Sequence, residues 1–192
     1  MPGTTRPISV DDLLVSPSPS TVKSPASKRQ EADALLLLSQ TLARNPGHAI
    51  QQLASSALSL TGAESAGVTL EDMEAGECIL RWIATAGRAK IYQDGTMPRD
   101  FSPCGEAMNR RQALMMQDPV RYYTYLDALQ LPIRTALLVP FARRGKFVGT
   151  VWTIRHKDAD PFDTEQQRIV ESLATFAAAI LDAQASREGG AH

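Results

Sequence analysis

The stretch Arg134–His156, "RTALLVPFARRGKFVGTVWTIRH", decides the fold class. Its two apolar runs are joined by "ARRG", and a glycine at that place is typical of a β-hairpin turn. Apolar residues are consecutive within each run, since Leu137 is followed by Leu138 and Val151 by Trp152. Both faces of such strands are expected to be buried. The stretch therefore predicts two inner strands of a sheet that is covered on both sides.

Segments with helical spacing flank this hairpin in the sequence. "QEADALLLLSQTLARN" (30–45) and "GHAIQQLASSALSLTG" (47–62) precede it, and "DPFDTEQQRIVESLATFAAAILDAQ" (160–184) follows it. Their apolar residues recur every three or four positions, as on one face of a helix. Two further segments, 65–72 and 78–87, have the two-residue period of strands. Helices, then an antiparallel sheet, then a closing helix predict an α+β fold.

The domain boundaries follow from composition. Residues 1–29 are rich in Pro, Ser and Thr, so we expect a disordered segment that buries too little apolar surface to fold. We expect one folded domain over 30–185 and a flexible tail over 186–192. Within the first segment, "ISVDDLLV" (Ile8–Val15) is either incidental apolar sequence or a segment that docks on a partner.

Charge and cysteine content exclude several classes of function. The net charge of −1 provides no field to attract nucleic acid or an anionic membrane. Two cysteines, Cys78 and Cys104, are too few for a disulfide framework. No apolar run approaches the roughly 18 residues that suggest a membrane span, so we expect a cytoplasmic protein. The chain closes on "SREGGAH". We therefore expect no output module and an action through another chain.

Three stretches resemble the GAF domain, a small sensory fold of bacterial signalling proteins. "FSPCGEAMNRRQALMMQDP" (101–119) is similar to the family's glycine turn, short helix and strand ending in Asp. "LLVPFARRGKFVGTVWTIRH" (137–156) is similar to its strand–hairpin–strand unit, and "FDTEQQRIVESLATFAAAIL" (162–181) to its closing helix. The resemblance covers about residues 29–185. It implies a central antiparallel sheet of five to six strands, with the N- and C-terminal helices on one face. Loops and short helices would roof a pocket on the other face.

The resemblance places candidate ligand-binding residues around this pocket. Aromatic candidates are Trp82, Tyr92, Phe101, Tyr122, Tyr123 and Trp152, with Tyr125 also in the roof. Polar candidates are Arg99, Ser102, Asp118, Arg134 and Thr150, and Cys104 and Gly105 would form the lip of the pocket. Arg99, Arg134 and the backbone N–H groups near Gly105 would receive an anionic ligand. The sequence leaves open whether Trp152 faces the helices or the pocket.

Cys104 has several interpretations. It resembles the cysteine of the free methionine sulfoxide reductases, but the segment before the hairpin lacks the further cysteine that those enzymes carry. Bilin attachment is not favoured, because no histidine lies near it. We expect Cys104 to be a buried wall residue. We expect His48 and His156 to meet solvent or cap a turn, so neither haem nor a metal site is predicted. "TIRHKDADPFDTEQ" matches the cyclic-nucleotide branch of the family only in part.

These observations predict a stand-alone sensory domain without catalytic residues. A small molecule, whose identity the sequence leaves unknown, would order the roof, and the change would pass through the sheet to the terminal helices. We expect a homodimer through the first and last helices, or a signalling protein as partner. The alternatives are a thiol-dependent reductase and a pure dimerisation or interaction module whose pocket is filled by Trp82 and Trp152.

Overall fold

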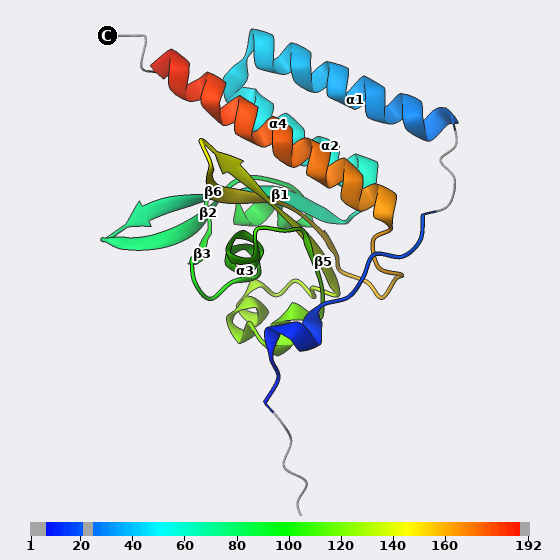
Figure 1. Cartoon of the computed structure of the whole chain (residues 1–192), viewed down its shortest axis with the longest axis vertical. Coiled ribbons are helices and arrows are strands. Elements are labelled where there is room, and N and C mark those ends of the chain that lie inside the picture. Colours follow the sequence, from blue (N-terminus) through cyan, green and yellow to red (C-terminus); the bar gives the residue numbers. More distant parts are fainter. Residues whose placement is uncertain (1–6, 21–24, 189–192) are drawn as a thin grey trace, which may run out of the picture.

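The computed structural model describes residues 7–20 and 25–188. Over these residues the chain forms one curved six-stranded sheet between a helical layer and a roof of short elements (Figure 1). The helices are α1 (Pro25–Arg44), α2 (Pro46–Thr61), α3 (Pro103–Arg110) and α4 (Thr164–Glu188). The strands are β1 (Ser65–Glu74), β2 (Glu77–Gly87), β3 (Thr96–Pro98), β4 (Leu114–Gln117), β5 (Thr135–Arg143) and β6 (Lys146–Arg155). Four short 3-10 helices are η1 (Val10–Leu13), η2 (Arg88–Tyr92), η3 (Pro119–Arg121) and η4 (Thr124–Leu129).

The sheet confirms the predicted α+β class. Its strand order is β3-β2-β1-β6-β5-β4, and every neighbouring pair is antiparallel. The predicted hairpin is formed by β5 and β6, which are central strands. Its turn residues Arg144 and Gly145 have φ values of 50° and 82°. Two consecutive positive φ values are the mark of a type I′ turn, which suits the twist of a hairpin.

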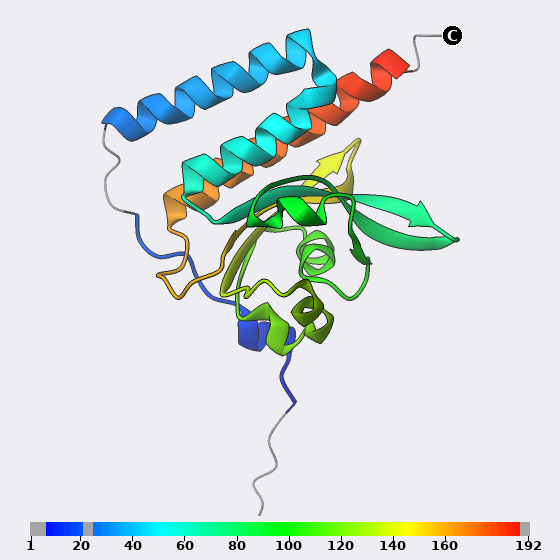
Figure 2. The same ribbon diagram turned by 180° about the vertical axis from the view of Figure 1, so that it is seen from behind.

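Three helices form a layer on one face of the sheet. α2 and α4 lie against the sheet, and α1 lies outside them (Figures 1 and 2). By length and composition, α4 between Thr164 and Ser186 could cross a membrane. However, Val170, Leu173 and Ala177 on this helix are buried in the core. An apolar helix whose residues pack in this way is a core helix.

Two apolar cores lie on the two faces of the sheet. Alternation along β5 sends Leu137 and Val139 to the helix-side core, and Ala136 and Leu138 to the roof-side core. In β2 a bulge interrupts the alternation, since Val68 pairs with Ala84 but Thr69 pairs with Trp82. The extra residue reverses the faces, so Trp82 enters the roof-side core although Ala84 belongs to the helix-side core.

Within the segment 1–29, for which we expected disorder, residues 7–20 pack against the folded domain. Leu14 forms a β-bridge with Met116 on the edge strand β4, and the Val15 N–H donates to the Met115 carbonyl. Leu13 is 1% exposed within the roof-side core. We call residues 7–20 the strap.

The strap also reaches the start of α4. The Ser18 N–H donates to the Phe162 carbonyl, and the Thr164 N–H donates to the Ser18 carbonyl. The apolar run Ile8–Val15 therefore docks on its own chain, where it covers a sheet edge that would otherwise be open. Residues 1–6 and 21–24 of the predicted segment, and 189–192 of the predicted tail, lie outside the described residues. α4 continues to Glu188, into the segment that we expected to be a tail.

Candidate functional site

A small cavity lies between the sheet and the roof. The sheet contributes Trp82, Ala136, Leu138, Trp152 and Ile154 to its wall. The roof contributes Tyr92, Cys104, Leu126, Leu129, Leu131 and Ile133. The cavity volume is about 50 Å³, and no polar atom contributes to its surface. Pockets that hold drug-sized ligands have roughly 300–1,000 Å³, so this cavity is far smaller.

The two tryptophans of the chain both lie on the sheet side of the cavity. Their ring centroids lie 5.8 Å apart with the planes at 54°. Trp152 lies on the roof side of the sheet, and its Nε1–H donates to Oγ1 of Thr69 on β1 at 2.9 Å. Its indole lies over Gly67, where a Cβ atom would collide with the ring. Trp82 presents carbon atoms to the cavity, and its buried Nε1–H has no partner among the described residues.

Cys104 lies in the cavity wall, near the start of α3. The side chain is buried, and Sγ lies 3.8 Å from Thr69 Oγ1. Burial raises the pKa of this thiol, although contacts with Thr150 and Thr69 act in the opposite direction. The reactive form of cysteine is the thiolate, so at neutral pH this thiol is held in the unreactive form. Cys78, in contrast, is exposed at the start of β2.

The α3 N-terminus is not open to an anionic ligand. Ser102 caps the helix, because its Oγ accepts a hydrogen bond from the Gly105 N–H at 3.0 Å. The Glu106 N–H donates to the Ser102 carbonyl. Gly105 packs so closely on the Arg99 carbonyl that no Cβ would fit. Gly105 is thus needed for close backbone packing, and neither it nor Ser102 lines the cavity.

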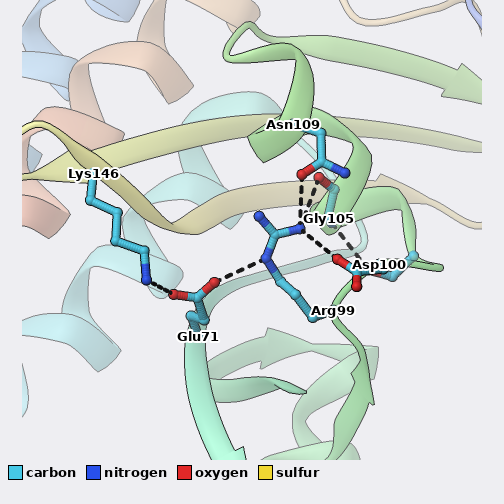
Figure 3. Close-up of polar contacts among 7 residues, drawn as sticks. Glu71, Arg99, Asp100, Gly105, Asn109 and Lys146 are labelled. Atoms are coloured by element: carbon cyan, nitrogen blue, oxygen red, sulfur yellow. Dashed lines mark hydrogen bonds and ion pairs between the residues drawn. The ribbon is translucent and has the colours of Figure 1, made fainter. Parts of the chain in front are cut away.

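Arg99 belongs to an ionic clamp at the margin of the roof, the group of Glu71, Arg99, Asn109 and Lys146 (Figure 3). Glu71 Oε1 lies 3.1 Å from Arg99 Nε, and Glu71 Oε2 lies 2.5 Å from Lys146 Nζ. Arg99 Nη1 also donates to Asn109 Oδ1 at 3.0 Å. Burial by itself raises the pKa of Glu71, but the bonds from Lys146 and Arg99 outweigh it and hold this pKa below its usual value. The clamp ties the loop before α3 to β1 and β6.

Arg134 and Asp118 lie outside the cavity, in an open depression on the roof. Arg134 Nη1 bonds to Asp118 Oδ1 at 3.0 Å, and Arg134 Nε lies 3.3 Å from Asp158 Oδ1. Both predicted ligand-binding residues are therefore paired with other groups of the chain.

Phe101 and three tyrosines form an aromatic cluster near the start of α3. The Phe101 ring centroid lies 5.4 Å from Tyr122, 5.2 Å from Tyr123 and 6.1 Å from Tyr125. Phe101 is 44% exposed, and none of the four rings lines the cavity. Burial raises the pKa values of the Tyr123 and Tyr125 hydroxyls. Of the predicted site residues, the structure brings only Trp82, Tyr92, Cys104 and Trp152 to the cavity wall.

His156 is a cavity residue that the sequence analysis assigned wrongly. We expected it to meet solvent or cap a turn, but it is 3% exposed and lines the cavity. Its Nδ1–H donates to the Pro132 carbonyl at 2.6 Å, since a carbonyl can only accept. Its Nε2 therefore accepts from Ser65 Oγ, also at 2.6 Å. The signal was present in the sequence, because His156 continues the two-residue period of Trp152 and Ile154.

The segment Gln130–Arg134, which we call the wall segment, separates the cavity from the open depression. Leu131 and Ile133 line both spaces. Two side chains tie this region to the body: His156 bonds to the Pro132 carbonyl, and the Tyr92 hydroxyl donates to the Leu129 carbonyl. The wall segment is therefore bounded by the cavity on one side and by the open depression on the other.

Metal chemistry finds no support in the described part of the chain. No group of three or more His, Cys, Asp or Glu side chains is placed there to hold a metal ion.

Comparisons with known proteins point to one family. A family model described as "GAF domain" matches residues 43–182. No curated relative matches the chain. Similar solved structures include the GAF-B domain of DevS from Mycobacterium smegmatis, at 23% identity and a TM-score of 0.61, covering 77% of this chain and 100% of that one. The GAF domain of a phosphoenolpyruvate-protein phosphotransferase from Coxiella burnetii has 18% identity, a TM-score of 0.69, and coverages of 87% and 99%. A free methionine-R-sulfoxide reductase from Neisseria meningitidis, solved with its substrate, has 15% identity, a TM-score of 0.68, and coverages of 88% and 98%.

Proposed function

Because the chain belongs to the GAF domain family, a family of sensory domains, we propose that it binds a small molecule in the inner cavity and signals through its helices. The single observation that carries the proposal is the cavity itself. It lies between the sheet and a roof of short elements, and the Trp82–Trp152 pair forms one wall. A site at this place can sense occupancy, because the guest touches the sheet and the roof together.

The signal would leave through the helical layer. The strap connects the two halves of the molecule, since Leu13 lies in the roof-side core and Ser18 bonds to residues at the start of α4. A shift of the roof on ligand binding would therefore act on α4 through the strap as well as through the sheet. On the outer helix α1, Leu36 and Leu37 are 58% and 47% exposed. We propose that this apolar surface, with α4, contacts a second copy or a signalling partner in the cytoplasm.

A pure assembly module is the second candidate, and the size of the cavity favours it. Trp82 and Trp152 fill much of the space under the roof and leave about 50 Å³. If the remaining space binds nothing, the exposed leucines of α1 would still support assembly.

The reductase alternative has less support. It needs a thiolate nucleophile and a second thiol that closes a disulfide. Cys104 is buried with a raised pKa, whereas Cys78 is exposed at a strand start. The similarity to the Neisseria enzyme, at 15% identity, concerns the fold alone.

The proposed function is tested with the full chain purified under native conditions from cells. Mass spectrometry identifies small molecules that dissociate on unfolding, and each is added back to ligand-free protein. The proposal expects a raised melting temperature and a changed oligomeric state by light scattering. An assembly module would show a constant oligomeric state with no released molecule, and that result would count against sensing.

A further inference from the structure

The wall of the cavity restricts the chemistry of a guest. None of the described residues that line it is Asp, Glu, Lys or Arg. The two arginines that we expected to bind a ligand are paired elsewhere: Arg99 with Glu71, and Arg134 with Asp118. His156 lines the cavity, but both of its nitrogens are bonded to other groups. A charged guest would lose its hydration without gaining a partner. The free energy of that desolvation is far larger than the apolar contacts of a small cavity can offset.

An uncharged polar guest is disfavoured for the same reason. No polar atom contributes to the surface of the cavity, and Trp152 Nε1–H is already bonded to Thr69. The Trp82 Nε1–H is buried, but it does not contribute to the cavity surface either. Cavities of this kind stay dry and accept apolar molecules.

The volume sets the size of the guest. A cavity needs at least roughly 10–15 Å³ to hold one water, which takes up about 30 Å³ in the liquid. At about 50 Å³, this cavity has room for a guest of only a few non-hydrogen atoms. Nucleotides and tetrapyrroles are many times larger, so they would require the tryptophan pair and the roof to move apart.

We propose that the cavity selects a small apolar molecule of only a few non-hydrogen atoms, such as a short hydrocarbon, and excludes polar and ionic molecules of the same shape. This inference rests on the proposed function and specifies its ligand class. We infer that the wall segment is the route of entry, because Leu131 and Ile133 line both the cavity and the open depression.

Three planar probes of equal size separate these chemistries: isobutene, acetone and acetate. The chain has two tryptophans, both in the cavity wall, so an NMR spectrum of ¹⁵N-labelled full-length protein contains two indole N–H signals, which both report on this site. We expect isobutene to move both signals saturably. Acetone should bind at least tenfold more weakly, because its carbonyl finds no donor. Acetate should leave both signals unchanged.

A matched pair of variants locates the binding. Ala136 lines the cavity, whereas Ala142 lies on the same strand and outside it. Ala136→Val should abolish the response to isobutene, and Ala142→Val should keep it. Equal binding of acetone with a downfield move of the Trp82 signal would overturn the proposal, because the Trp82 N–H would then have turned to donate to the guest. Absence of any isobutene response would also overturn it.

The two proposals fail separately. If a larger molecule is released from native protein and changes the oligomeric state, sensing stands and the apolar class is wrong. If isobutene binds but no small molecule changes the helical layer, the apolar class stands and sensing is wrong.

Discussion

The strap gives the sharpest stability prediction, through Leu13. This side chain is 1% exposed in the roof-side core, although composition predicts disorder for the segment. Replacing a fully buried leucine by alanine removes its apolar contacts and leaves a cavity, at a cost of about 2–4 kcal/mol. We therefore expect Leu13→Ala to lower the free energy of unfolding by that amount. With a urea m-value of about 2 kcal/mol/M, the midpoint should fall by roughly 1–2 M.

Ile8→Ala is the matched control in the same segment. Ile8 is 38% exposed, so we expect its replacement to change the free energy of unfolding by at most about 0.5 kcal/mol. Both variants are measured by urea denaturation, followed by tryptophan fluorescence and circular dichroism. If Leu13→Ala changes stability no more than Ile8→Ala does, the strap is not part of the folded unit, and its role in coupling the roof to α4 is refuted.

Three further predictions concern the site. His156→Phe removes the bond to the Pro132 carbonyl, so amide hydrogen exchange in the wall segment should rise about tenfold. Unchanged exchange would show that this bond does not hold the wall segment in place. Because the pKa of Glu71 is lowered in the folded protein, this carboxylate stabilises the fold at pH values above its ordinary pKa of 4.5. The stabilisation is lost as the pH falls through the lowered pKa. Acid unfolding of Glu71→Gln should accordingly depend less on pH than that of the unchanged protein, and identical profiles would contradict the clamp. In the native protein, the exposed Cys78 thiol should react with a disulfide reagent, and the buried Cys104 thiol should react only after unfolding. Rapid reaction of both thiols in the native protein would mean that Cys104 is accessible.

Sequence patterns predicted the elements that have a clear period. The hairpin of β5 and β6, the closing helix and the α+β class follow from runs of apolar residues and from the glycine turn at Gly145. α2 begins after the cap residue Asn45 with Pro46 in its first turn and ends at Gly62, with φ of 63°, which are the residue types favoured at helix starts and ends. These features depend on neighbouring residues only, so local sequence is sufficient to predict them.

The composition of the cavity wall depended on long-range features that local sequence does not contain. The bulge in β2, at Ile83 opposite Val68 and Thr69, turns Trp82 toward the roof, and its position cannot be predicted from alternation. The folded state of the strap was missed because the composition of residues 1–29 is dominated by Pro, Ser and Thr. The segment is held in place by one buried side chain, Leu13, and by a few backbone hydrogen bonds. Arg99 and Arg134 were expected to bind ligand, but each found an acidic partner in the fold.

The sensing function and the apolar ligand class both require free space under the roof, and Ala136→Val measures whether that space exists. Valine adds two carbon atoms to a side chain in the cavity wall, and the β-branched residue suits a strand. The account predicts a free energy of unfolding equal to or above that of the unchanged protein, with Ala142→Val as the control. A loss of about 1–3 kcal/mol, as overpacking of a filled interior causes, would contradict it.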